Sequence, residues 1–189
     1  MTNRTVLYGI GVSAGTASGP LAVVRPAVGV DDNEPAAVEG DSERVKAALQ
    51  EVAESLKQRA EHANSATSKQ VLEATATLAT DRGLIRGIEK ELKKGTGVTH
   101  AIHDAVEVYA GKLRKLGGYM AERVTDLYDI RARATARGRG LPEPGVPAFA
   151  EPSILVAHAL APAETATLDP ERVLGIVTEG GGATSHTAI

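Results

Sequence analysis

A glycine-rich segment near the C-terminus, residues 179–189, carries the side chains best suited to chemistry. Its sequence is EGGGATSHTAI, so Thr184 and Ser185 precede His186 and Thr187 follows it. Consecutive glycines let the backbone approach a ligand closely, and the N–H groups of such a turn can hold an anion. A neutral imidazole is a good nucleophile near pH 7 and can form a covalent intermediate. The segment therefore predicts a histidine that takes up a group beside an anion-binding turn.

The same residues allow a second interpretation, a structural glycine-rich turn whose histidine has no chemical role. Two other motifs of this general kind do not fit. The segment lacks the lysine of the phosphate-binding pattern GxxxxGK[ST], and it has no glycine at the last position of the GxSxG nucleophile turn. On residue types alone, the chemical and the structural interpretation both stay open.

Short apolar runs typical of buried strands would position this segment. We expect strands at residues 5–12, 21–24, 153–157 and 173–177, and a short helix over residues 161–168. A strand, a helix and a strand in this order, directly before the glycines, fit a βαβ unit.

A long stretch between these strands is nearly free of residues that break helices. No proline occurs between Pro35 and Pro142, and proline scarcity predicts a helical block over about residues 41–139. Apolar residues at helical spacing predict five helix faces that pack as an antiparallel bundle. We expect Ser42 and Thr99 to cap the first and the fourth helix. The five faces are Val45, Leu49, Val52 and Leu56; Val71, Leu72, Thr75, Leu78 and Ala79; Leu84, Ile85, Ile88 and Leu92; Ile102, Ala105, Val106, Tyr109, Leu113 and Leu116; and Met120, Arg123, Val124, Leu127 and Ile130.

The composition excludes several classes of protein. With 189 residues, 42% of them hydrophobic and 24% charged, we expect a folded chain of one domain or two small ones. The absence of cysteine excludes disulfides, thiolate nucleophiles and cysteine-bound metals. Aromatic residues at 3% and a net charge of −3 argue against nucleic-acid binding. Without an apolar run of about 18 residues or a hydrophobic leader, we expect a cytoplasmic protein with no membrane span.

Four parts of the sequence resemble one known family. Residues 181–189, GGATSHTAI, closely resemble the phosphohistidine signature of phosphoenolpyruvate-utilising enzymes. The opening GIGVSAGTASGP of residues 9–20 is similar to the start of enzyme I of the bacterial sugar phosphotransferase system, a member of that group. The runs 160–166 and 173–178 look like its strand–helix–strand approach to the histidine, and the helical insertion is similar too. The resemblance covers the whole chain.

The resemblance implies a catalytic role for two residues. His186 would be phosphorylated at Nε2 by phosphoenolpyruvate and would pass the phosphoryl group to a histidine of the small carrier protein HPr. Thr165 falls where the family has a threonine that hydrogen-bonds the unphosphorylated histidine, which would hold the ring in one tautomer. Candidates for holding the phosphate are Gly181, Gly182, Thr184, Ser185 and Thr187.

In this family the helical insertion is the domain on which HPr docks. The positions at or near its docking surface are Val71, Leu78, Leu84, Tyr119, Met120 and Arg123. The chain departs from some members at Thr75, Ala76, Thr77 and Tyr128, where those members carry larger apolar or basic residues. These departures predict a smaller and less basic docking surface.

The predicted fold class is therefore an α/β phosphohistidine swivelling subdomain with an inserted all-α helical bundle. We expect the α/β subdomain in residues 1–30 and 141–189, where it looks truncated just after His186, and the HPr-binding bundle in residues 31–140. Family members continue into a barrel that binds phosphoenolpyruvate and Mg²⁺ and that forms the dimer. The resemblance thus implies no metal site in this chain, a monomer, and no turnover of phosphoenolpyruvate by this piece alone.

Two other functions fit parts of the pattern. One is the swivel domain of a pyruvate phosphate dikinase or a phosphoenolpyruvate synthase, for whose nucleotide-binding domain the chain has no room before His186. The other is a non-catalytic helical adaptor, against which the intact His186 and Thr165 argue. Elsewhere, a metal site at His100, His103 and Asp104 is a weaker interpretation than a solvated helix face.

Overall fold

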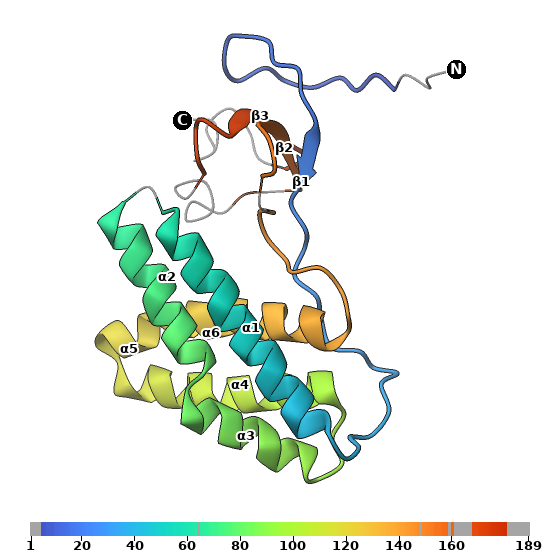
Figure 1. Cartoon of the computed structure of the whole chain (residues 1–189), viewed down its shortest axis with the longest axis vertical. Coiled ribbons are helices and arrows are strands. Elements are labelled where there is room, and N and C mark those ends of the chain that lie inside the picture. Colours follow the sequence, from blue (N-terminus) through green and yellow to red (C-terminus); the bar gives the residue numbers. More distant parts are fainter. Residues whose placement is uncertain (1–4, 64, 148, 159, 161–167, 181–189) are drawn as a thin grey trace. The chain divides into compact units, whose positions relative to one another are not determined.

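The computed structural model describes residues 5–63, 65–147, 149–158, 160 and 168–180. The chain forms two compact units, of which one comprises Met1–Val24 with Val146–Ile189 and the other comprises Arg25–Gly145. A small parallel sheet builds the first unit and a helical bundle builds the second (Figure 1). The elements in chain order are β1 (Leu21–Val23), α1 (Asp41–Glu61), α2 (Ala66–Ala79), α3 (Arg82–Leu92), α4 (Val98–Leu116), α5 (Gly118–Glu122), α6 (Val124–Gly138), β2 (Ser153–Ala157) and β3 (Val173–Thr178).

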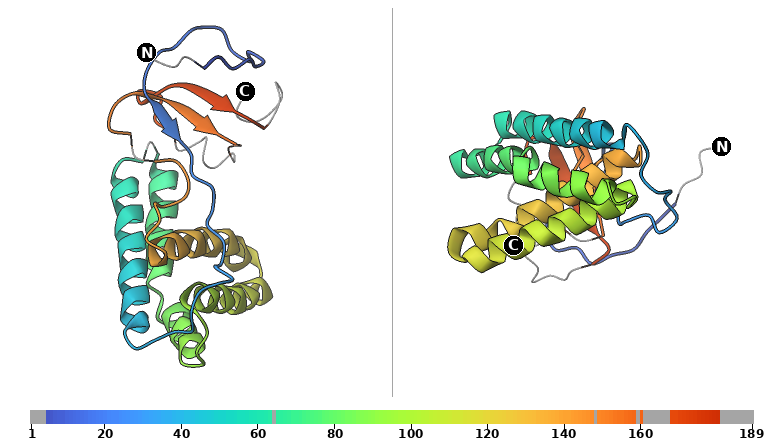
Figure 2. Two further views of the ribbon diagram at one scale, coloured as in Figure 1. Left: turned by 90° about the vertical axis from the view of Figure 1, so that its right-hand side faces the viewer. Right: turned by 90° about the horizontal axis from the view of Figure 1, so that it is seen from below.

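The sheet has the strand order β1-β2-β3, and both pairs are parallel (Figure 2). Its three strands lie at the predicted positions to within one residue at each end. Leu155 and Ala157 of β2 are buried, with Val146, Phe149 and Val173 among the apolar residues that pack around them. The central strand thus supplies the core of this unit.

The strand predicted at residues 5–12 does not form, which corrects the sequence interpretation. These residues are irregular and exposed, with Tyr8 at 96% and Ile10 at 87% of full accessibility. A strand needs a neighbour for its backbone hydrogen bonds, and no described residue pairs with this segment. The predicted helix over residues 161–168 lies outside the described residues, apart from Leu168.

The helical unit confirms the predicted bundle. Val45, Leu49, Val52 and Leu56 follow one stripe of α1 and are all at most 4% exposed. α1 and α2 lie side by side, α6 packs against both, and α4 packs against α6 and α3 (Figure 1). Most residues on the other predicted faces are buried in the same core, namely Ala79, Leu84, Ile88, Leu92, Ile102, Ala105, Val106, Leu113, Val124, Leu127 and Ile130.

Both predicted helix caps are wrong. α1 begins at Asp41 after Gly40, and the carboxylate of Asp41 accepts a hydrogen bond from the N–H of Val38. α4 begins one residue before Thr99, whose hydroxyl accepts a hydrogen bond from the N–H of Asp31 at 2.8 Å. Ser42 and Thr99 therefore do not act as the N-caps of these helices.

A distant carboxylate caps α4 instead. Glu34 accepts hydrogen bonds from the N–H groups of Thr99 at 2.8 Å and His100 at 2.9 Å. A Cβ at Gly97 would lie 2.4 Å from the Glu34 side chain, so only glycine leaves room for this cap. Nδ1 of His100 also lies 2.8 Å from the same carboxylate. The segment that leaves the sheet is thereby held on the bundle.

The Glu34–His100 pair gives the helical unit a pH-dependent contact. The hydrogen bond to Glu34 raises the pKa of His100 above 6.5. Burial would raise the pKa of Glu34, but the backbone N–H groups and His100 outweigh it and hold that pKa below 4.5. Both groups are therefore charged between pH 4.5 and 6.5. The contribution of His100 is lost as the pH rises through its raised pKa, and that of Glu34 is lost as the pH falls through its lowered pKa.

We accordingly predict that His100→Gln lowers the thermal stability of the helical unit most between pH 4.5 and 6.5. Glutamine cannot carry the charge, so the difference from the wild type should shrink as the pH rises through the raised pKa of His100. Circular dichroism melts across this pH range measure it. An equal loss at every pH would mean that the His100 ring acts only through packing.

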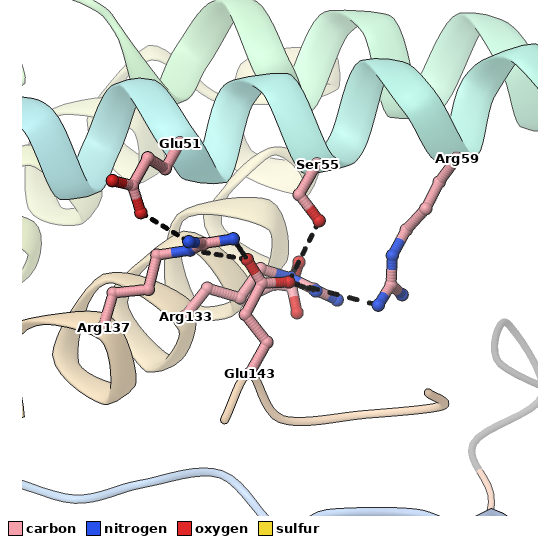
Figure 3. Close-up of polar contacts among 7 residues, drawn as sticks. Glu51, Ser55, Arg59, Arg133, Arg137 and Glu143 are labelled. Atoms are coloured by element: carbon pink, nitrogen blue, oxygen red, sulfur yellow. Dashed lines mark hydrogen bonds and ion pairs between the residues drawn. The ribbon is translucent and has the colours of Figure 1, made fainter. Parts of the chain in front are cut away.

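The segment that returns to the sheet is held by a second carboxylate, Glu143 (Figure 3). It accepts hydrogen bonds from Ser55 of α1 at 3.1 Å, from Nη1 of Arg133 at 2.9 Å and from Nε of Arg137 at 2.7 Å. Arg59 of α1 approaches to 4.0 Å. The Glu143 side chain is only 13% exposed, so these contacts form a largely buried network between α1, α6 and the connecting segment.

These two anchors explain why the boundaries of the helical unit differ from the predicted residues 31–140. The structure places them at Arg25 and Gly145, about five residues further out on each side. Arg25 and Gly145 pair as an antiparallel bridge, with hydrogen bonds of 3.2 and 2.8 Å. Both connecting segments therefore belong to the bundle.

Candidate functional site

The carboxyl ends of β2 and β3 form the frame for the predicted chemistry. After the strands end, the N–H of Glu179 donates to the carbonyl of Ala157 at 3.1 Å, and that of Gly180 donates to the carbonyl of His158 at 2.7 Å. In open parallel sheets, ligands bind beside the carboxyl ends of the strands. The described backbone thus leads from the carboxyl end of β3 into the glycine-rich segment. This end of the sheet is where a ligand site is expected.

The residues predicted for catalysis and phosphate binding lie outside the described residues. They are His186, Thr165, Gly181, Gly182, Thr184, Ser185 and Thr187. Their roles stay predictions.

His158 and Glu179 occupy the described part of this edge. Nδ1 of His158 lies 3.0 Å from the Glu179 carboxylate, and their side chains are 85% and 77% exposed. At this exposure, His158 is not a buried structural histidine.

Three of the six predicted docking residues are clearly exposed on the helical unit. Val71 of α2 is 47% exposed, and Tyr119 and Met120 of α5 are 66% and 41% exposed. Leu78 is partly buried and packs against the bundle core. The structure therefore offers an apolar surface on α2 and α5 that a partner could cover.

Leu84 corrects the predicted docking set, because it is 0% exposed and belongs to the core of the bundle. Its side chain follows the same face of α3 as Ile88 and Leu92, at helical spacing. It can support a docking surface from beneath but does not line one.

The positive charge of Arg123 is already paired with a carboxylate of the helical unit. Its guanidinium lies 2.7 Å from the Asp126 carboxylate, and the arginine side chain is 11% exposed. The same guanidinium lies 5.9 Å from the centre of the Tyr119 ring. Burial raises the pKa of Asp126, and the charge of Arg123 opposes this rise. Arg123 therefore positions Tyr119 more than it offers a free charge.

The departures from the family pattern lie mostly beneath this surface. Thr75 is 4% exposed, and its hydroxyl donates to the carbonyl of Val71 at 2.8 Å, while Ala76 is fully buried. Thr77 is exposed, and its hydroxyl donates to the carbonyl of Glu73. Tyr128 lies under Arg131, with 4.6 Å between ring centre and guanidinium. Only Thr77 therefore changes the exposed surface of α2.

Sequence reasoning missed two exposed apolar residues on α4. Val108 is 60% exposed and received no role, and Leu116, expected in the core, is 69% exposed. The signal was available for Val108, which lies off the main apolar stripe, whereas Leu116 continues that stripe and is exposed as the last residue of α4.

The described residues contain neither a metal-binding group nor a membrane-spanning helix. No group of three His, Cys, Asp or Glu side chains in that part of the chain could hold a metal ion. Among the same residues, no helix is both long and apolar enough to cross a bilayer.

Comparison with known proteins decides the family. The family description "PEP-utilising enzyme, N-terminal" matches residues 8–123, and "PEP-utilising enzyme, mobile domain" matches residues 149–189. The chain belongs to the PEP-utilising enzymes. The first match covers the helical unit up to α5, and the second covers β2, β3 and the glycine-rich segment.

Two relatives among the PEP-utilising enzymes have the same name. The chain is 43% identical over 191 residues to the phosphoenolpyruvate-protein phosphotransferase of Streptomyces coelicolor, covering 98% of this chain and 34% of that protein. It is 30% identical over 190 residues to the protein of the same name from Listeria innocua, covering 97% and 33%. The chain thus spans about a third of the length of these relatives.

Solved structures agree with the fold. An Enzyme I solution structure matches with a TM-score of 0.68 at 29% identity, over 94% of this chain and 75% of that one. A structure described as the N-terminal domain of Enzyme 1 – Nitrogen matches with a TM-score of 0.58 at 23% identity, again over 94% and 75%. The helix-rich fold with a small parallel sheet is therefore that of the N-terminal part of enzyme I.

Proposed function

We propose that this chain is the phosphoryl-carrying N-terminal part of a phosphoenolpyruvate-protein phosphotransferase. His186 takes a phosphoryl group that originates from phosphoenolpyruvate and passes it to a histidine of HPr. The observation that carries this proposal is the 43% identity with a protein of that name across 98% of the chain. The geometry of the sheet supports it, because β3 pairs with β2 up to Thr178 and the segment that holds His186 follows β3 directly in the sequence.

The proposed chemistry has two steps at one nitrogen. The lone pair of Nε2 of His186 attacks phosphorus, the bond from phosphorus to the enol oxygen breaks, and the released enol becomes pyruvate by taking a proton on carbon. The histidine of HPr then attacks the same phosphorus, and the phosphorus–Nε2 bond breaks. Positioning and charge stabilisation supply most of the catalysis in such transfers. Backbone N–H groups of residues 181–185 and the nearby hydroxyls are the candidates for holding the phosphate.

The finer fold assignment belongs to the same proposal. The sheet unit would be the swivelling phosphohistidine subdomain, and the helical unit, inserted between β1 and β2, would be the HPr-docking domain. Bound Mg²⁺ would neutralise phosphate charge in the whole enzyme. Its ligands are proposed to lie in parts of the whole enzyme that this chain does not span. The whole enzyme is proposed to be a dimer through parts that this chain does not span.

The test is transfer of label from HPr that carries a ³²P-phosphohistidine. The purified chain should become labelled, and the label should survive alkali but not acid, as a phosphorus–nitrogen bond requires. A chain that takes no label would act as an adaptor instead. An acid-stable label would point to Ser185 or a threonine and would overturn the assignment of His186.

Thr165→Ala should slow this transfer by up to about tenfold without stopping it. A hydroxyl that accepts from the ring N–H not involved in attack orients the imidazole, and one lost hydrogen bond costs about 0.5–1.5 kcal/mol. Rapid-quench measurement of label transfer gives the rate. Thr165→Ser is the matched control, because it keeps the hydroxyl and should stay near the wild-type rate. A complete loss in Thr165→Ala would give Thr165 a direct role in the reaction.

A further inference from the structure

The chain between β1 and α1 forms a strap that lies against the helical bundle (blue in Figure 2). The strap comprises residues 26–40 and has neither helix nor strand. It is held at the start of α4, where the N–H of Asp31 donates to the hydroxyl of Thr99 at 2.8 Å. It is also held at the end of α6, where Arg139 lies 3.5 Å from the carboxylate of Asp31. The strap therefore contacts two helix ends without being part of either helix.

Apolar packing contributes little to this contact. The structure describes every residue of the strap, and none of them is buried. Ala37 packs against the bundle core, but Val38 is 68% exposed. A cavity of about 430 Å³ is lined by strap residues and by the ends of α1, α4 and α6. Segments with few buried apolar contacts open locally at a free energy well below that of global unfolding. The strap is therefore suited to open while the bundle stays folded.

One carboxylate makes the strongest contacts of the strap. Glu34 accepts hydrogen bonds from the N–H groups of Thr99 and His100, and Nδ1 of His100 lies 2.8 Å from the same carboxylate. The Glu34 side chain is 11% exposed, so water screens these contacts only partly. The ion pair between Arg139 and Asp31 is longer, at 3.5 Å. Because hydrogen bonds to a charged group are about twice as strong as neutral ones, the charge state of Glu34 and His100 determines how firmly the strap is held.

The charged groups that face His100 within the described residues are acidic. Nδ1 of His100 faces Glu34, and Nε2 lies 3.7 Å from Asp32, which is also on the strap. Asp104 adds a third negative charge from α4 itself. The hydrogen bond to Glu34 is the main cause that raises the pKa of His100 above 6.5, and burial opposes it. Two of the three charges that favour a proton on His100 thus belong to the strap, so a protonated His100 attracts the strap to α4.

We propose that the strap is a proton-sensitive latch, which is closed while His100 is positively charged and Glu34 is ionised and which opens locally when either charge is lost. Opening frees residues 26–40, and a free chain extends by up to about 3.3–3.6 Å per residue. The latch thereby sets the length of the connection between β1 and α1. It takes no part in the proposed phosphoryl transfer at His186.

The direction of the pH response follows from the two pKa shifts. The pKa of His100 is raised, so its contribution is complete below 6.5 and is lost as the pH rises through the raised value. Burial would raise the pKa of Glu34, but the hydrogen bonds from Thr99 and His100 hold it below 4.5, so its contribution is lost only in acid. Near neutral pH, His100 is therefore the group that senses protons.

Amide hydrogen exchange of the full chain, measured by NMR between about pH 5.5 and 8.5, tests the latch on both sides of the ordinary histidine pKa. Dividing each rate by the intrinsic exchange rate at that pH gives a protection factor. The reporters are the N–H groups of Asp31, Thr99 and His100, which donate across the contact. We expect their protection to fall about fivefold over this range, because the contact loses its charge assistance. The reference, Ala105 in the buried interior of α4, should stay far more protected than the reporters at every pH.

Three variants separate the two charges from the packing. His100→Gln keeps a polar side chain without the charge, so reporter protection should equal the wild-type value at about pH 8.5 throughout the range. Glu34→Gln removes the charged acceptor and should lower reporter protection about tenfold at about pH 5.5. His62→Gln is the matched control, because His62 is exposed at the end of α1 and its replacement should leave the wild-type profile unchanged. Thermal melts check that each variant is folded.

Two results would overturn the latch. If the reporters are as well protected as Ala105, the strap opens only when the whole bundle unfolds. If His100→Gln keeps the wild-type dependence of protection on pH, or if the wild type has no such dependence, His100 does not hold the strap by its charge.

Discussion

Replacement of His186 by alanine should abolish the uptake of label from phosphorylated HPr while leaving the helical and sheet units folded. In the proposed reaction Nε2 of His186 is the only bond-forming atom that this chain supplies, so no slower route within the site remains. We expect the glycines before it, and not the imidazole, to determine the backbone conformation of this segment. The measurement is acid-labile label on the purified variant, with circular dichroism to check that it is folded.

His158→Ala is the matched control for this experiment. His158 stands at the same edge of the sheet, is exposed and pairs only with Glu179 among the described residues. The His158→Ala variant should therefore accept label at the wild-type level. If His186→Ala still becomes labelled and His158→Ala does not, the carrier is His158 and the interpretation of the glycine-rich segment is wrong.

The apolar spacing was sufficient to predict the helices and the core of the bundle. Leu49, Val52, Ile102 and Leu127 lie on predicted stripes and are at most 1% exposed. Helical periodicity records which side of a helix is buried, and burial in this unit comes from its own helices. The three strands of the sheet were predicted from short apolar runs between prolines and glycines, which are typical of strands.

Prediction failed where the role or the partner of a residue does not follow from local spacing. The family resemblance placed Leu84 at the docking surface, whereas its helical spacing put it on an apolar face that the packing of α3 on α4 buries completely. Residues 5–12 are a short apolar run typical of a strand, but strand formation depends on a neighbouring strand that the local sequence does not show. Glu34 caps α4 across 65 positions of sequence, and no local rule selects it over Thr99.

The catalytic motif and the docking surface differ in the same way in how far the sequence predicts them. The catalytic motif stays a prediction that rests on contiguous residue types, whereas the docking surface depends on exposure in three dimensions. Val108 and Lys112 line a groove between α3 and α4, where the small residues Gly87 and Ala105 lie in close contact. Periodicity predicts each of the two helices, but the groove depends on how closely they approach each other.

Glu143→Ala should produce the largest loss of stability of any single charged residue in the helical unit, about 3 kcal/mol. The change leaves the 8% exposed Arg133 with Asp129 as its remaining carboxylate at 2.7 Å, and it leaves Ser55 without an acceptor. Removing one partner of a buried ion pair costs about 3–5 kcal/mol, because the other charge stays buried. The retained Asp129 pair places the expected value at the lower end. For a unit of this size the melting temperature should fall by about 10 °C.

Glu51→Ala is the control from the same network. Glu51 also pairs with Arg137, but its side chain is 55% exposed, so its loss should cost less than about 1 kcal/mol. Glu143→Gln should fall between the two, because the amide keeps an acceptor and loses the charge. Equal losses in Glu51→Ala and Glu143→Ala would show that charge count, and not burial, determines the stability of this network.

The pH dependence of the Glu143→Ala effect provides a second check. Burial alone would raise the pKa of Glu143, but hydrogen bonds from Arg137 and Ser55 and the charges of Arg133 and Arg137 hold it below 4.5. A carboxylate with a lowered pKa stabilises the folded state above its ordinary pKa and loses this effect as the pH falls through the lowered value. The stability difference between wild type and Glu143→Ala should therefore be constant near neutral pH and shrink in acid. A difference that stays constant through acid denaturation would mean that Glu143 acts through its packing and not through its charge.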